Sequence, residues 1–479
     1  MTPCPHCRLD CGAAPKIRRE VAESCLRSRD SPCLACQKLL EIEQKIEETR
    51  RTLLKLLTEK DELASAVNEH HDPFLNQLPA ELVSHVFALS RPYLPSLNIF
   101  DPENFDEHTN IQGVLNPGQV CRNWRSIAHR SPELWTVFGV RIKMNPCASA
   151  VQLSLEWLER SGICPLFMWL DAEEPPNGHV SQPARDFLTL VAQHAHRWKV
   201  LNLYAPIEIV PILCSATEGN GFGHLQHLLI DTRIEQLDGP YQTDLPVSPL
   251  WLTVEPSCGL ESLLIDWSRL TRFLGFFNFQ CTILEFVHLF NNAPNLLACH
   301  VGTVTEIVDP AMLAQLRARP NTLVTHNSLR TLRVGTCETN LWNYFDFPSL
   351  KKLCLGYIDK PEVWISLRDF LRRSSCKITD LRILGYPSQV IEILQTLKLT
   401  THVERLGIQR FELADCLLPE ISNIFLFGDP ERSNPELLPK LGALIFYYSE
   451  EASTRFNWSS LNTFIVAGTS RDRKKLESV

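Results

Sequence analysis

A regular heptad pattern runs from Gln37 to about Asn68, where stripe positions recur at alternating steps of three and four residues. This spacing predicts one long amphipathic helix, because it matches the a and d positions of a coiled-coil repeat. No proline or glycine interrupts the run. Two interpretations stay open: the stripe packs on the chain's own surface, or it pairs with a second copy. The stripe positions, mostly apolar, are Leu39, Ile42, Ile46, Thr49, Leu53, Leu56, Lys60, Leu63 and Val67.

Two shorter amphipathic segments follow Pro73, which ends the long helix because it has no N–H to donate. The first begins near Pro79 and has Leu82, Val86 and Leu89 at helical spacing on one face. The second spans residues 118–129 and carries Val120, Cys121 and Trp124 on one side. Residues 131–135 then predict a turn leading into a third short helix or a strand.

A different pattern fills residues 144–468, where short apolar segments share the spacing L-x-x-L-x-L. This is the strand half of a leucine-rich repeat. Successive starts lie 21 to 38 residues apart, so the repeats are irregular. The predicted strands are centred on Trp198/Leu201/Leu203, Leu225/Leu228/Ile230, Leu260/Leu263/Ile265, Leu296/Cys299/Val301, Leu329/Leu332/Val334, Leu350/Leu353/Leu355, Ile378/Leu381/Ile383, Val403/Leu406/Ile408 and Leu441/Leu444/Phe446.

Helical segments are expected between these strands, at residues 186–197, 281–291, 364–373 and 389–397, with an earlier pair at 151–160 and 165–170 opening the array. Strand–helix units of this kind can stack as a solenoid with a parallel sheet and helices on the outside. The alternative is a non-repetitive α/β domain.

Composition narrows the classes of function. The chain has 479 residues and a net charge of −8, which argues against gripping nucleic acid over a broad surface. The first residues lack the apolar core of a signal peptide, and no apolar run reaches the ~18 residues that span a bilayer. The 17 cysteines mostly sit singly in apolar segments, as expected in a reducing compartment. We therefore expect a cytoplasmic or nuclear protein with no membrane partner.

The N-terminal cysteines raise the question of zinc. Cys4 and Cys7 form one pair and Cys33 and Cys36 a second, and two such pairs can surround Zn²⁺ tetrahedrally. The long gap between the pairs and the scarcity of glycine favour the alternative, a flexible cysteine-bearing leader over residues 1–36. We expect no cofactor, with zinc at these four cysteines as the competing hypothesis.

Catalytic motifs were not found. The chain has no G-x-x-x-x-G-K-[ST] phosphate loop, no G-x-G-x-x-G, no H-E-x-x-H and no G-x-S-x-G. No cysteine has a local signature of a nucleophile. The sequence therefore favours a binding protein and predicts no catalytic residues.

The ordered combination LPAELVSHVF … GQVCRNWRSIAHRSPELW resembles an F-box, which has Leu-Pro, a first helix, Val-Cys-x-x-Trp and a closing Leu-Trp. With the charged heptad helix before it and leucine-rich repeats after it, the chain is similar to fungal F-box proteins. One departure is the link from about Arg91 to Pro117, which is longer than the usual F-box loop.

The resemblance implies docking onto the Skp-family adaptor of a cullin–RING ubiquitin ligase. Carried over by position, the adaptor-binding residues would be Leu78, Pro79, Leu82, Val86, Val120, Cys121 and Trp124. The protein substrate would bind the repeat region, at residues that the resemblance does not identify. The alternative function is an interaction scaffold without any ligase.

The expected architecture is therefore multidomain. A leader at residues 1–36 precedes an amphipathic helix at 37–72. An all-α F-box-like module at 73–140 is followed by an α/β leucine-rich-repeat-like solenoid with parallel strands at 144–468. A short basic tail occupies residues 469–479.

Overall fold

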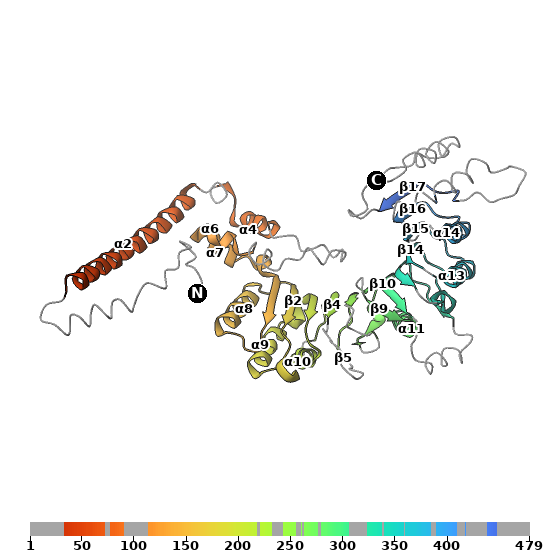
Figure 1. Ribbon diagram of the computed structural model, residues 1–479, viewed down its shortest axis with the longest axis horizontal. Helices are drawn as coiled ribbons and strands as arrows, with labels where there is room; N and C mark the ends of the chain where they lie inside the picture. Colours follow the sequence, from red (N-terminus) through yellow and green to blue (C-terminus); the bar gives the residue numbers. More distant parts are fainter. Residues whose placement is uncertain are drawn as a thin grey trace, which may run out of the picture. The chain divides into compact units, whose positions relative to one another are not determined.

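The computed structural model divides the chain into two compact units, residues 1–134 and residues 135–479 (Figure 1). The division falls six residues before the end that the sequence suggested for the F-box-like module. The structure describes residues 33–71, 77–90, 114–217, 221–231, 243–254, 260, 263–275, 279–305, 323–337, 340–358, 360–384, 389–409, 417 and 438–447. The predicted basic tail and most of the predicted leader lie outside these ranges.

The first unit begins with α2, a helix of 38 residues from Leu34 to His71. It contains the whole heptad run and confirms the predicted long helix. Side chains of the stripe remain exposed along its length, among them Ile46 at 61% and Leu63 at 60%. The observed packing therefore does not decide whether the stripe packs on the chain's own surface or pairs with a second copy.

Three shorter elements complete the described part of this unit: α4 at Ala80–Leu89, α6 at Pro117–Val120 and α7 at Arg122–His129. The prediction of a single helix over residues 118–129 was wrong, because the backbone is extended at Cys121, with φ −155° and ψ 174°. The Cys121 thiol accepts a hydrogen bond from the Trp124 N–H at 3.4 Å and so caps the second helix. A 3-10 turn, η2, follows at Pro132–Trp135.

The second unit is built on one large sheet in which every pair of neighbouring strands is parallel. Apart from β9, the strands lie side by side in the order in which they occur along the chain. They are β1 Val137–Ile142, β2 Leu166–Ala172, β3 Trp198–Tyr204, β4 His227–Asp231, β6 Trp251–Val254, β8 Arg272–Gly275, β10 Ala298–Thr305, β12 Thr331–Cys337, β14 Lys352–Tyr357, β15 Asp380–Leu384, β16 Arg405–Gln409 and β17 Ala443–Tyr447, with β9 Gln280–Thr282 beside β10.

Helices connect several of these strands, as parallel pairing requires. They are α8 Ala148–Arg160, α9 Gln182–Ala192, α10 Val210–Ala216, α11 Ile283–Asn292, α13 Pro361–Ser374 and α14 Val390–Leu397. The segment at 165–170, paired in the sequence analysis with the helix before it, forms β2. Two small sheets lie outside the main one: β5 Thr243–Asp244 pairs with β7 Leu263–Leu264, and β11 Val324–Thr325 pairs with β13 Phe345–Asp346.

The core is a continuous row of buried side chains that runs across the main sheet. Each member pairs in register with the next, and each is at most 2% exposed. Burial of this row stabilises the unit, because removing apolar surface from water contributes roughly 25 cal/mol per Å². The row consists of Met168, Leu201, Leu228, Leu252, Phe273, Cys299, Leu332, Leu353, Leu381 and Leu406.

Eight of the nine predicted L-x-x-L-x-L segments coincide with strands of the main sheet. The segment at Leu260/Leu263/Ile265 does not, because its strand β7 pairs with β5 in a small separate sheet. The main sheet instead passes from β4 through β6 and β8 to β10. Those two strands have the sequences WLTV and RFLG, which lack the six-residue pattern.

A column of glycines crosses three neighbouring strands. Gly302, Gly335 and Gly356 lie opposite one another, since Val301 pairs with Val334 and Val334 with Leu355. A Cβ added at Gly335 would stand 2.5 Å from the carbonyl oxygen of Gly302, and one added at Gly356 would come still closer to the carbonyl oxygen of Gly335. The backbones approach so closely here that only glycine fits.

None of the described helices is both long enough and apolar enough to cross a bilayer. The longest, α2, carries charged side chains throughout.

Candidate functional site

Helix α4 presents two different apolar faces. Val83 and Phe87 are buried, at 0% and 3% exposed, and Phe87 packs against the Trp124 ring at a centroid distance of 4.9 Å. This contact joins α4 to α7. The hydroxyl of Ser84 also donates to that of Ser131 at 2.6 Å, so α4 is held to the segment that follows α7.

The second face of α4 is left uncovered. Leu82, Val86 and Leu89 are 51%, 38% and 71% exposed, and their spacing of four and three residues places them on one side of the helix. Since the opposite side is already packed, the helix cannot turn to bury them. We call these three side chains the apolar patch; Val120 of α6 is a further exposed apolar side chain, at 40%.

The other residues named from the resemblance lie in different surroundings. Leu78 is half-buried and Pro79 is exposed just before α4, where the Pro79 carbonyl accepts the N–H groups of Leu82 and Val83. Cys121 is 3% exposed and Trp124 is half-buried. These last two belong to the packing and capping of α7, and they contribute little surface to a partner. Leu89 was not among the predicted site residues, although its spacing from Val86 pointed to it.

The cysteines proposed for zinc are only partly described. Cys4 and Cys7 lie outside the described residues, while Cys33 and Cys36 are half-buried at the start of α2. Within the described ranges, no group of three or more His, Cys, Asp and Glu side chains is arranged to hold a metal ion.

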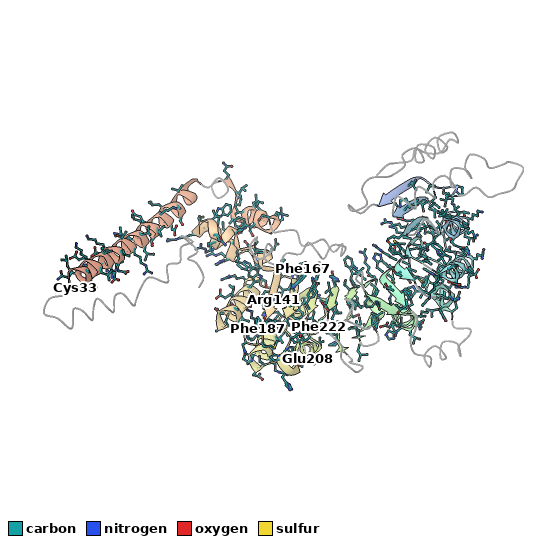
Figure 2. All side chains as sticks on the ribbon, viewed as in Figure 1. Cys33, Arg141, Phe167, Phe187, Glu208 and Phe222 are labelled. Carbon is teal, nitrogen blue, oxygen red and sulfur yellow. The ribbon has the colours of Figure 1, made fainter. Side chains whose placement is uncertain are left out.

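In the second unit, the side chains that alternate with the buried row form the second face of the main sheet. Phe167 of β2 and Arg141 of β1 (labelled in Figure 2) belong to this face, since Phe167 precedes the buried Met168 and Arg141 pairs with Asp171. Aromatic rings gather on the earlier strands, where Trp169 stacks on Tyr204 at 4.8 Å. Arg141 forms an ion pair with Asp171 at 2.8 Å beside them.

Further along the second face the side chains become basic. The pairing register places them in two adjacent rows, one passing through Arg272, Ala298, Thr331, Lys352, Asp380 and Arg405, the other through Leu274, His300, Arg333, Cys354 and Arg382. Asp380 is the one acidic side chain that the described residues place in these rows. We call the five cations Arg272, Arg333, Lys352, Arg382 and Arg405 the basic strip.

Buried histidines of this unit have structural roles. The Nε2 atom of His227 lies 3.1 Å from the Thr253 hydroxyl, and burial lowers the pKa of His227 to about 4. The Nε2 atom of His326 lies 2.9 Å from the Ala293 carbonyl, and its Nδ1 accepts the Leu329 N–H at 3.2 Å. Both rings are therefore engaged within the fold, and the Thr253 hydroxyl that meets His227 is completely buried, out of reach of a substrate.

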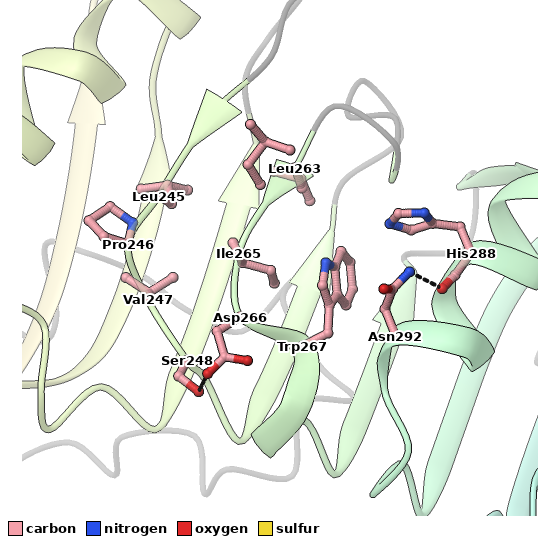
Figure 3. Close-up of a pocket in the computed structure, with 11 residues that line it drawn as sticks. Leu245, Pro246, Val247, Ser248, Leu263, Ile265, Asp266, Trp267, His288 and Asn292 are labelled. Carbon is pink, nitrogen blue, oxygen red and sulfur yellow. Dashed lines mark hydrogen bonds between the residues drawn. The ribbon is translucent and has the colours of Figure 1, made fainter.

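A groove of about 590 Å³ lies beside the small β5–β7 sheet (Figure 3). Among its lining side chains, the Trp267 and His288 rings meet edge to face at a centroid distance of 5.8 Å, and the hydroxyl of Ser248 donates to Asp266 at 2.8 Å. The hydrogen bonds from Ser268 and Ser248 lower the pKa of the Asp266 carboxyl. This carboxylate is thus already occupied in shaping the loop, and the groove offers no pair of groups suited to acid–base chemistry.

Comparison with known proteins yields no match, either to a protein-family model or to a curated protein. The functional assignment rests on the chain's own features.

Proposed function

We propose that this chain is the substrate-recognition subunit of a Skp–cullin–F-box ubiquitin ligase. In this proposal the F-box-like helices dock on a Skp-family adaptor. The parallel-sheet unit, arranged as a leucine-rich-repeat-like solenoid, holds a protein substrate. The chain performs no bond chemistry itself and raises the effective concentration of substrate lysines at a ubiquitin thioester.

The observation that carries the proposal is the apolar patch. Apolar side chains on a small helical unit tend to be buried, and a cluster left in solvent marks a site for a partner. Here the exposed side chains lie on α4, where the resemblance places the adaptor contact, and the opposite face of the helix is sealed by Val83 and Phe87. A folded helix with an unused apolar face suits a protein partner better than a small ligand.

The test is co-purification of the full-length chain with a Skp-family adaptor. Replacing Leu82 and Val86 together by Asp should abolish the complex, because each carboxylate would be desolvated at the interface. Leu153 of α8 and Ile391 of α14 are similarly exposed, at 53% and 69%, and serve as the matched control pair for substitution by Asp. Adaptor binding that survives Leu82→Asp/Val86→Asp would remove the proposed surface.

A second candidate, an interaction scaffold without a ligase, is favoured by the exposed stripe of α2. A scaffold of this kind would self-associate or bind partners through α2 and would retain no adaptor or cullin. The co-purification experiment separates the two, since the ligase proposal requires the adaptor to be present in the complex.

A further inference from the structure

The basic strip concentrates positive charge in a chain whose net charge is −8. Its five cations lie on β8, β12, β14, β15 and β16, and direct pairing links the rows without interruption. From β8 to β16 there are five strand spacings of ~4.8 Å, so the strip is about 24 Å long. Like charges held this close repel one another, and an anion placed among them relieves that repulsion.

Contacts within the strip fix the direction of its guanidinium groups. The Arg272 guanidinium lies over the Trp251 ring at 4.3 Å, a cation–π contact at one end of the strip. At the other end Asp380 accepts Arg382 Nε at 3.5 Å and lies 3.2 Å from an Arg405 nitrogen. The Arg382 and Arg405 side chains remain 45% and 48% exposed although Asp380 is nearly buried, so this carboxylate lies beneath them and orients them.

Near the middle of the strip, several of its cations lie close to the same two side chains, Cys354 and His300. Arg333 and Arg382 lie on either side of Cys354, one strand away in each direction. Burial raises the pKa of the Cys354 thiol, while both guanidinium charges oppose that rise. Burial lowers the pKa of His300 and, together with the smaller effects of the Arg333, Arg382 and Arg272 charges, brings it to about 4. The same cations therefore act on two neighbouring side chains.

We propose that the basic strip binds an extended acidic segment of a partner protein. A segment of about seven residues would cover its length, since an extended chain advances ~3.3 Å per residue. Glutamate and aspartate carboxylates would pair with the arginines, which offer a planar fork of donors suited to carboxylates. Asp380 shows this pairing within the chain itself, because one carboxylate already lies between two of the guanidinium groups.

Nucleic acid is the competing occupant for a basic surface. The strip holds few cations and is compact, whereas a nucleic-acid site tracks a longer backbone with many phosphate contacts. The acidic balance of the remaining chain would also repel a polyanion that extends beyond the strip. A short acidic peptide matches the charge that the strip presents and stays within its length.

Under the proposed function, the acidic segment would belong to the substrate of the ubiquitin ligase. Only this assignment to the substrate rests on the proposed function. Binding at the strip does not require the adaptor. Adaptor binding at the apolar patch and peptide binding at the basic strip can therefore be refuted independently of each other.

The test uses the purified full-length chain without adaptor and a fluorescein-labelled (Gly-Glu)₅ peptide, followed by fluorescence anisotropy at low salt. We expect saturable binding that weakens as salt is raised, because exposed charges are screened. The peptide (Gly-Gln)₅, of the same length but uncharged, should not bind. The double variant Arg333→Gln/Arg382→Gln should weaken binding of the acidic peptide about tenfold or more.

The matched control is Arg372→Gln/Lys377→Gln, which removes the same charge from two exposed positions outside the strip. It should weaken binding far less than the strip variant, because neither position lies in the two rows that the peptide would follow. The single exchange Lys352→Glu should also weaken binding of the acidic peptide, and it does not disturb packing because this position is exposed. Equal loss in the strip and control variants, or tighter binding of a single-stranded oligonucleotide of equal charge, would overturn the proposal.

Discussion

At Gly335 and Gly356 the main sheet leaves no room for a side chain, and this has a measurable consequence for stability. We expect Gly356→Ala to lower the free energy of unfolding by about 3 kcal/mol or more, because the new methyl group would meet backbone of the neighbouring strand, which cannot move aside. Chemical denaturation of the purified protein measures the change.

Gly223 provides the control for this substitution. It lies in a turn with nothing within 4 Å of the position that a Cβ would take. Gly223→Ala should change the free energy of unfolding by less than about 1 kcal/mol. Similar values for the two variants would contradict the close approach of the strands at the glycine column.

Single residues also mark the limits of what the sequence could predict about the candidate site. Helical spacing placed Leu82 and Val86 on one face, the resemblance named them as adaptor contacts, and both lie in the apolar patch. Cys121 was assigned to the same surface, yet its extended backbone makes it a helix cap. That conformation depends on the thiol accepting the Trp124 N–H, a local interaction that competes with a continuous helix and that periodicity does not reveal.

At the scale of elements, α2 carries an apolar stripe whose side chains remain largely exposed to solvent. Its stripe has the a/d spacing of a coiled coil, with polar residues at Thr49 and Lys60, and a single lysine at an a position is a known device for setting register. We expect the full-length chain to self-associate at micromolar concentration, as measured by sedimentation velocity. Leu53→Glu/Leu56→Glu should shift the protein to monomer.

The control for that experiment is Thr52→Glu/Thr58→Glu, which adds the same charge on the same two turns of α2 but outside the stripe. Its sedimentation should match that of the unaltered chain. A chain that is monomeric before any substitution would favour packing of α2 on its own surface or on a different protein.

Sequence periodicity predicted both strands and helices of this unit, since the helices expected at 281–291, 364–373 and 389–397 coincide with α11, α13 and α14. The L-x-x-L-x-L pattern works because alternate side chains enter one buried row, which selects leucine and its relatives at fixed spacing. It failed at Leu260/Leu263/Ile265 because apolar alternation does not say which sheet a strand joins. Strands β6 and β8 were missed because Pro249 and Gly275 stand where the register calls for an apolar residue of the pattern.

The basic strip could not have been predicted at this scale. Its members are separated by 19 to 61 residues in the sequence and become neighbours only through strand register. Each arginine alone looks like an ordinary solvated position. Register across several parallel strands is therefore the information that sequence periodicity lacks.

At the scale of the whole molecule, buried histidines link stability to pH. His227 has a pKa of about 4 when folded and an ordinary value of 6.5 when unfolded. Between these values the unfolded chain binds a proton that the folded chain does not, so this contribution to stability is present above pH 6.5 and is lost as pH falls toward 4. From pH 7 to pH 5 we expect His227 alone to reduce the free energy of unfolding by about 2 kcal/mol.

Urea unfolding at the two pH values measures this loss. His227→Gln should reduce it, because glutamine does not titrate, and the exposed His196→Gln should leave it unchanged. His300, whose pKa is also about 4, contributes in the same direction. A variant lacking His227 that keeps the full dependence on pH would show that this ring is not buried in its neutral form.

The glycine column also constrains how the chain could be redesigned. An extra strand inserted between β12 and β14 would have to carry its own glycine at the matching place, because its backbone would lie between two strands that accept no Cβ there. Units copied from the β2–β4 end, which has Asp171, Tyr204 and Asp231 in register instead, would not be interchangeable with units of this segment. The sheet could therefore be lengthened where the neighbouring strands carry side chains at this position, but not between the strands of the glycine column unless the new strand also has a glycine there.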